Sequence, residues 1–123
     1  MAAASGGITS FLDMPNNVPS ATSITAIQAK IDSAAATAVT HHGFFIGATP
    51  NNLGELQAAV GTPDKPNPRD GICGIKIFMG SSTGDLLVDE QSALEGIFSQ
   101  TSGVIAVHAE DEGRLNERRP QFE

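Results

Sequence analysis

The stretch GIKIFMG, residues 74–80, places a single lysine, Lys76, inside an apolar run. Its isoleucines, phenylalanine and methionine are typical of a β-strand, and a glycine bounds it on each side. Apolar residues occupy both alternating faces, so the run predicts a strand covered on both sides, as in a parallel sheet. Because lysine is rarely buried without compensation of its charge, Lys76 needs an explanation.

Three further runs of the same kind occur along the chain, ITSFLDM at 8–14, FFIGA at 44–48 and VIAVHA at 104–109. The segments between the strands carry apolar residues at three- and four-residue spacing, which predicts helices over 20–39, 52–60 and 89–100. Strands that alternate with helices predict an α/β fold with a parallel sheet.

Composition excludes several classes of function. The chain has 123 residues, enough for one domain, and a formal net charge of −7. An acidic chain with no basic stripe argues against nucleic acid and anionic membrane as partners. The one cysteine, Cys73, rules out a disulfide within the chain and favours a cytoplasmic location, and no apolar stretch is long enough to span a membrane.

Both ends of the sequence look interrupted. Residues 1–7, MAAASGG, resemble the last turn of a helix with its glycine stop, and residues 114–123 are polar and follow a strand. We therefore expect residues 1–123 to form a single partial domain, truncated at both ends, with a polar Pro-rich loop insertion at 61–70. Four parallel strands alone would leave two sheet edges open, which would favour a longer protein or a homo-oligomer.

Lys76 and His108 are candidate functional residues on two of the expected strands. Lys76 shares a strand face with Ile72 and Phe78 by alternation, and it is either a lysine that extends to water or an amine tuned by burial. His108, near the end of its strand, is either a core histidine or a metal ligand or proton shuttle. The acidic residues that follow it, Glu110, Asp111 and Glu112, either support His108 as a ligand or form a solvated turn, and the solvated turn is favoured.

Asn16 is the third candidate. It follows the strand at 8–14 and is either a turn residue after Pro15 or an amide that reaches into a pocket. Asn16, Lys76 and His108 all fall at or near the C-terminal ends of different strands. Parallel α/β barrels place their chemistry at that rim, so the three together favour a functional site.

The motif GSSTG, residues 80–84, opens a different class of function. It matches the G-x-S-x-G pattern of serine hydrolases, with Ser82 as the nucleophile. That pattern should lead directly into a helix, whereas GDLLVD at 84–89 intervenes. The serine hydrolase therefore remains a weaker alternative.

The segments GGITSFLDMPN, GIKIFMGSSTG followed by LLVD, and VHAEDE together resemble the cyclic amidohydrolases, and within them most the dihydroorotases, with allantoinase and hydantoinase as relatives. The resemblance covers almost the whole chain and a middle portion of the enzyme. It implies a (β/α)8 barrel, of which this chain would hold about strands two to five with their helices.

The resemblance also implies roles. Lys76 matches the lysine that CO2 carboxylates to bridge two zinc ions, His108 matches a zinc ligand, and Asn16 matches the asparagine that holds the substrate's carboxylate. The implied reaction is the metal-dependent hydrolysis of a cyclic amide, with dihydroorotate and N-carbamoyl-aspartate interconverted in pyrimidine biosynthesis.

The chain departs from the family pattern at several positions. The H-x-H pair, the later histidine and the catalytic aspartate are absent, and Asn17 and Val18 replace a threonine and an asparagine. We therefore expect the chain alone to be inactive. The alternative is a non-catalytic half-barrel or pseudo-enzyme relative that acts through self-association or partner binding.

Overall fold

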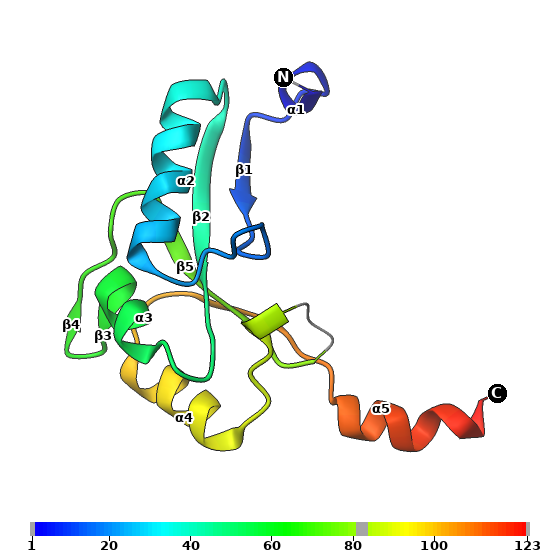
Figure 1. Ribbon diagram of the computed structural model, residues 1–123. Coiled ribbons are helices and arrows are strands. Elements are labelled where there is room, and N and C mark those ends of the chain that lie inside the picture. The colour runs from blue at the N-terminus through cyan, green and yellow to red at the C-terminus, as the bar shows by residue number, and fades with distance from the viewer. Residues whose placement is uncertain (1, 81–83, 123) are drawn as a thin grey trace.

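A four-stranded parallel sheet organises the computed structural model, which describes residues 2–80 and 84–122 (Figure 1). The strand order is β1-β2-β5-β6 and every pair is parallel. The bounds are β1 (Ser10–Asp13), β2 (His41–Gly47), β5 (Ile72–Phe78) and β6 (Ile105–His108). Parallel strands that alternate with helices along the chain confirm the predicted α/β class.

Three helices connect the strands and cover one face of the sheet (Figure 1). They are α2 (Ile24–Thr37), α3 (Leu53–Val60) and α4 (Gln91–Gln100), close to the predicted ranges. The N-cap of α2 is Ser23, whose hydroxyl accepts a hydrogen bond from the Ala26 N–H at 3.2 Å. The Glu55 carboxylate of α3 also accepts a hydrogen bond from the Ile24 N–H at 2.6 Å. Two side chains thus accept from backbone N–H groups in the first turn of α2.

The core lies between the sheet and these helices. Its fully buried members include Ile27, Ile46, Leu56, Ile75 and Ile77. They come from α2, β2, α3 and β5, so each βα unit contributes to one continuous cluster. Burial of these side chains is the main stabilising term of the fold.

An irregularity in β5 changes which side chains share a face. Phe44 of β2 pairs with Ile72, but the next residue, Phe45, pairs with Gly74, so the register shifts by one. Ile72, before the shift, and Ile75, after it, both pack in the core. The expectation from simple alternation that Ile72 shares a face with Lys76 is therefore wrong, because a β-bulge reverses the alternation.

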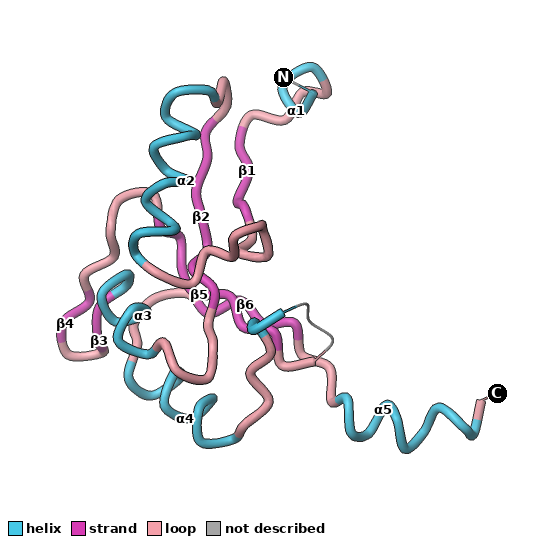
Figure 2. Tube along the Cα trace, in the orientation of Figure 1, coloured by secondary structure: helices cyan, strands magenta, loops and turns pink. Residues whose placement is uncertain are grey.

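The remaining elements lie outside the sheet. They are α1 (Ala2–Ser5), a hairpin of β3 (Gly61–Thr62) and β4 (Lys65–Pro66), η1 (Gly84–Leu86), α5 (Glu112–Arg118) and η2 (Arg119–Gln121). The hairpin lies within residues 61–70, where a loop was expected. Figure 2 shows α5 extending away from the body, and the sequence gives no apolar periodicity from which to predict it. In the described part of the chain, no helix has the length and apolar character needed to cross a membrane.

Candidate functional site

Lys76 and His108 lie on the same face of the sheet, on neighbouring strands. The register of β5 with β6 pairs Lys76 with Ala106 and Phe78 with His108. Side chains alternate along a strand, so these four residues share the face opposite the buried Ile75 and Ile77 side chains. The helices cover the other face, which leaves Lys76 and His108 on the side of the sheet where a barrel has its interior.

Phe78 contacts both candidates. The Lys76 Nζ atom lies 4.8 Å from the centroid of the Phe78 ring, within the range of a cation–π interaction. The Phe78 and His108 rings stack with their centroids 6.2 Å apart and an interplanar angle of 29°. The aromatic ring thus holds the amine and the imidazole against one apolar surface near the C-terminal ends of β5 and β6.

The environment of Lys76 shifts its protonation equilibrium toward the neutral amine. Burial lowers the pKa of the Lys76 amine below 10.5, because desolvation disfavours the charged ammonium. A neutral amine is the nucleophilic form of lysine, so the shift increases the fraction able to react with an electrophile at neutral pH. The interpretation of Lys76 as a tuned amine is consistent with this environment.

His108 has a carboxylate partner, Glu110. Its Nε2 atom lies 3.0 Å from Oε2 of Glu110, and both side chains are close to half-exposed. Glu110 follows the end of β6, where a solvated turn was the favoured expectation and a group that supports His108 was the alternative. A carboxylate that hydrogen-bonds one ring nitrogen fixes the ring orientation and leaves the other nitrogen to bind a ligand. The only available signal was the two-residue spacing from the histidine.

Asn16 lies at the same end of the sheet, beyond a different strand. It is exposed in the loop after β1, and no described residue hydrogen-bonds its side chain. Strand β2 separates β1 from β5, so strand spacing puts the loop and Lys76 roughly 10 Å apart across the sheet. The structure therefore brings Lys76 and His108 onto one face and places Asn16 at the same end of the sheet, two strands away from Lys76.

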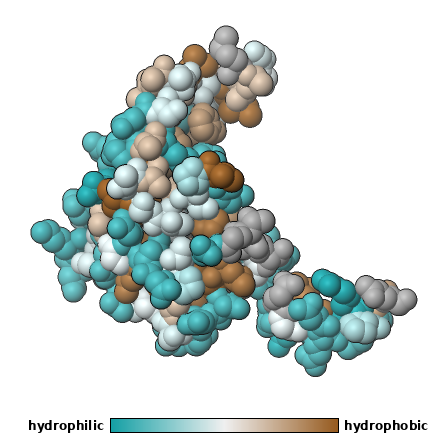
Figure 3. Space-filling view, viewed as in Figure 1, coloured by the Kyte–Doolittle hydropathy of each residue, from teal (hydrophilic) through white to brown (hydrophobic). Residues whose placement is uncertain are grey.

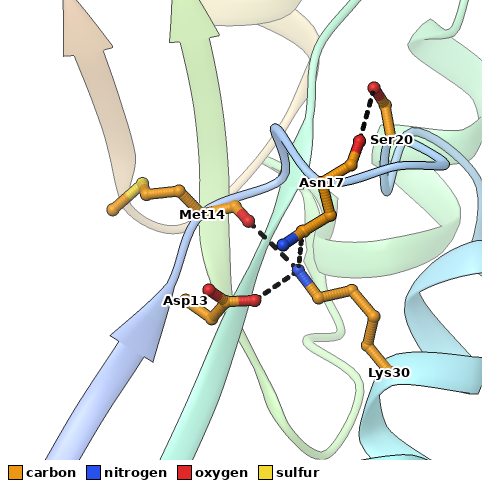
Figure 4. Close-up of polar contacts among 5 residues, drawn as sticks. All are labelled: Asp13, Met14, Asn17, Ser20 and Lys30. Carbon is orange, nitrogen blue, oxygen red and sulfur yellow. Dashed lines mark hydrogen bonds and ion pairs between the residues drawn. The ribbon is translucent and has the colours of Figure 1, made fainter.

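Asp13, at the end of β1, belongs to the opposite face. Its carboxylate pairs with the Lys30 ammonium of α2 at 2.5 Å (Figure 4). Asp13 pairs in register with Phe44, which is in the core beside α2. Asp13 therefore pairs with a helix residue on the face opposite Lys76 and His108.

Hydrogen bonds of one side chain connect the loops that follow β1 and β2 at this end of the sheet. Asn52, before α3, accepts from the Thr49 N–H at 2.8 Å and donates to the carbonyls of Thr22 and Gly47 at 2.8 and 2.9 Å. One side-chain amide thereby joins the loops that follow β1 and β2. The sequence placed Asn52 only at the start of a helix, because its partner Thr22 is 30 residues away.

Apolar side chains remain exposed on the two edge strands. Phe11 and Leu12 of β1 and Val107 of β6 are each more than a third exposed. On the face drawn in Figure 3, hydrophobic patches lie among hydrophilic surface on the body of the molecule. Two open parallel edges with apolar side chains are surfaces that folded proteins normally cover.

The side chains at the site fit part of a metal centre. Lys76 and His108 offer one amine and one imidazole, and within residues 2–80 and 84–122 no three His, Cys, Asp or Glu side chains cluster as metal ligands. A closed zinc site needs four ligands and a catalytic one three, so these two could supply only a portion. Ser82, the candidate nucleophile of the alternative, lies outside the described residues.

Several known proteins are similar to this chain in sequence. The chain is 34% identical to an allantoinase of Streptomyces avermitilis over 119 residues, which covers 93% of this chain and 25% of that protein. It is 31% identical to a dihydroorotase of Methanosarcina mazei over 116 residues, covering 90% and 23%.

A solved structure agrees with these sequence matches. The L-hydantoinase (dihydropyrimidinase) of Arthrobacter aurescens superposes on 98% of this chain and 26% of its own length, with a TM-score of 0.76 and 28% identity. No family model matches the chain. The chain thus spans about a quarter of the length of the curated relatives it matches.

Proposed function

Because the chain belongs to the cyclic amidohydrolase superfamily, we propose that it contributes part of the active site of a zinc-dependent hydrolase of cyclic amides. Within that class we favour dihydroorotase, which interconverts dihydroorotate and N-carbamoyl-aspartate in pyrimidine biosynthesis. The observation that carries the proposal is the placement of Lys76 and His108 on one open sheet face, on adjacent strands near their C-terminal ends.

Lys76 is proposed to react with CO2. The neutral amine nitrogen attacks the carbon of CO2, an N–C bond forms, and the nitrogen loses a proton to water. The product is a carbamate, whose two oxygens can each bind a metal ion. This change replaces a partly desolvated cation by an anionic ligand, which the positive charge of bound metal would compensate. Lys76 would thereby bridge two zinc ions.

His108 is proposed to be a ligand of one of those ions. Glu110 would hold the imidazole through Nε2, which leaves Nδ1 as the ligand atom. When bound, the metal pair would polarise the ring carbonyl of the substrate and lower the pKa of water. The Asn16 amide would donate hydrogen bonds to a carboxylate of the substrate from across the site.

A first experiment tests the carbamate directly. The purified chain is mixed with 13C-bicarbonate and zinc, and 13C NMR follows the appearance of a protein-bound carbamate carbon. We expect a signal that is absent from Lys76→Met and present in Lys65→Met, whose lysine is exposed on β4. A bound carbon that survives Lys76→Met, or no bound carbon in the wild-type chain, would contradict the role of Lys76.

A second experiment chooses among substrates. The samples are longer polypeptides that contain this chain and have metal-dependent hydrolase activity. Each is assayed with dihydroorotate, allantoin, hydantoin and dihydrouracil. We expect dihydroorotate to give the highest kcat/KM and Asn16→Ala to raise KM for it more than for rings without a carboxylate. Preference for allantoin or hydantoin would keep the class of reaction and refute dihydroorotase.

The open edges of the sheet favour a second candidate, a half-barrel that self-associates. Both β1 and β6 are edge strands of four residues, and each exposes apolar side chains. Sedimentation equilibrium of the purified chain tests it. A dimer that forms without metal or substrate would support this candidate, and a monomer at all concentrations would refute it.

A further inference from the structure

Lys30 makes contacts that are unusual for a lysine on a helix surface. Its ammonium donates to the Met14 carbonyl at 3.1 Å and to Oδ1 of Asn17 at 2.5 Å, and it pairs with the Asp13 carboxylate at 2.5 Å (Figure 4). A lysine ammonium has three N–H donors, and here there are three acceptors for them. The Lys30 side chain is only 18% exposed, and its Nζ lies 5.3 Å from the Phe44 ring centroid.

The three acceptors bracket Asn16. Asp13 and Met14 precede it and Asn17 follows it, so one ammonium fixes the chain on both sides of the exposed asparagine. Pro15 between them is fully buried, and its carbonyl accepts from the Ala21 N–H at 3.0 Å. The loop is thereby closed around Asn16, while no described residue hydrogen-bonds the Asn16 amide itself.

We propose that Lys30 is a positioning residue that orders the loop after β1 and so presents the Asn16 amide to the substrate. The inference rests on the proposed function, in which Asn16 binds a carboxylate. Ordering a loop and a side chain on binding weakens affinity, so a loop already fixed by Lys30 would bind the substrate more tightly. Lys30 acts from the helix face of the sheet and has no contact with the substrate.

The claim that Lys30 orders the loop after β1 is tested by 15N relaxation NMR on the purified 123-residue chain. Lys30→Met removes all three donors and keeps an apolar side chain of similar length, and Lys65→Met is the matched control. We expect the backbone order parameter at Asn16 to fall from about 0.85 to below about 0.6 in Lys30→Met. Asn51, in the loop after β2, should not change, and Lys30→Arg should restore most of the order because arginine also carries several donors.

Two results of this experiment would overturn the proposal. An Asn16 order parameter that is unchanged in Lys30→Met would show that the loop is held by other contacts. Equal losses at Asn16 and Asn51 would show a general loss of stability in place of local positioning.

The claim that the ordered loop presents the Asn16 amide to the substrate is tested on the same samples. Dihydroorotate, which has a carboxylate, and hydantoin, which has none, are titrated while the Asn16 side-chain amide signals are followed. We expect dihydroorotate alone to shift them, with an affinity about 2- to 12-fold weaker in Lys30→Met, as expected when one side chain must be ordered on binding. Equal affinity in the two chains would overturn the positioning role.

Failure of the proposed function would be visible separately. If dihydroorotate leaves the Asn16 signals of the wild-type chain unchanged, the substrate role of Asn16 is refuted, and with it the substrate half of this inference. The relaxation data would then still decide whether Lys30 orders the loop.

Discussion

Lys76 and His108 both contact the ring of Phe78, Lys76 through its ammonium and His108 through its stacked imidazole. The two residues are 32 positions apart in sequence and lie on neighbouring parallel strands. The βα connection between β5 and β6 brings them together on the open face of the sheet. The proposed metal site rests on this arrangement, in which the partly desolvated amine of Lys76 and the oriented imidazole of His108 share one aromatic neighbour.

The lowered pKa of Lys76 predicts how stability depends on pH. Between the lowered folded-state pKa and 10.5, the unfolded chain binds a proton that the folded chain does not. Stability of the wild-type chain therefore rises with pH across this window, and the cost of the desolvated charge is fully present below it. We expect Lys76→Met to be more stable than wild type near neutral pH, with the difference shrinking as the pH approaches 10.5.

Urea unfolding in buffer free of CO2 and metal measures this difference, so that the amine stays unmodified. Lys65→Met is the control, because Lys65 is exposed on the β4 hairpin. A stability difference between Lys76→Met and wild type that stays constant from neutral pH to 10.5 would contradict the assigned shift.

The bulge at Gly74 predicts a position that tolerates no side chain. Gly74 has a φ of +156°, and a Cβ there would lie 2.3 Å from the Val104 carbonyl oxygen. We expect Gly74→Ala to lower the free energy of unfolding by about 1–3 kcal/mol, because the edge strand β6 would have to move. Gly54→Ala is the control: it meets nothing within 4 Å in α3 and should be neutral or stabilising. Equal unfolding midpoints for the two variants would refute the account of the bulge.

The side-chain amide of Asn52 predicts a stability effect that its neighbour lacks. Asn52→Ala removes three hydrogen bonds to the loops after β1 and β2 and leaves their backbone groups without these partners. We expect a loss of about 1–3 kcal/mol in the free energy of unfolding. Asn51→Ala, at an exposed position, should change it by less than about 0.5 kcal/mol. Thermal unfolding of both variants measures the effect, and a similar loss in both would argue against the role of Asn52.

The small number of metal ligands predicts that the 123-residue chain has no turnover by itself. Lys76 and His108 supply fewer ligands than a catalytic zinc site requires, and the described residues hold no larger ligand cluster. We expect no opening of dihydroorotate above the uncatalysed rate, with or without added zinc, in an absorbance assay. Metal-dependent turnover that disappears with EDTA and in His108→Ala would overturn this expectation.

Much of the fold could be predicted from local sequence pattern. The apolar runs around residues 44–48 and 74–79 become β2 and β5, because strands covered on both faces need apolar residues at every position. The bulge at Gly74 could not be predicted, since it depends on the register with β2 and reverses the side of Ile72. Helix α5 has no apolar stripe from which its existence could be inferred.

Local sequence pattern also predicted part of the candidate site. Lys76, His108 and Asn16 stand out because polar residues at strand ends interrupt or follow apolar runs. Lys30 and Asn52 could not be identified, because each appears in the sequence as an ordinary residue of a helix or its start. Their roles arise from contacts with residues 13 to 30 positions away, which only the folded chain brings together.

The most direct test of the central claim uses the three histidines of the chain. His41 and His42 begin β2, whereas His108 ends β6, so they lie at opposite ends of the parallel sheet. Zinc is titrated into the chain in the presence of bicarbonate, and the ring nitrogens of all three histidines are followed by 15N NMR. The account predicts that His108 shifts first and that Lys76→Met weakens its response. Response of His41 and His42 without His108, or an unchanged His108 response in Lys76→Met, would contradict a metal site at the strand ends.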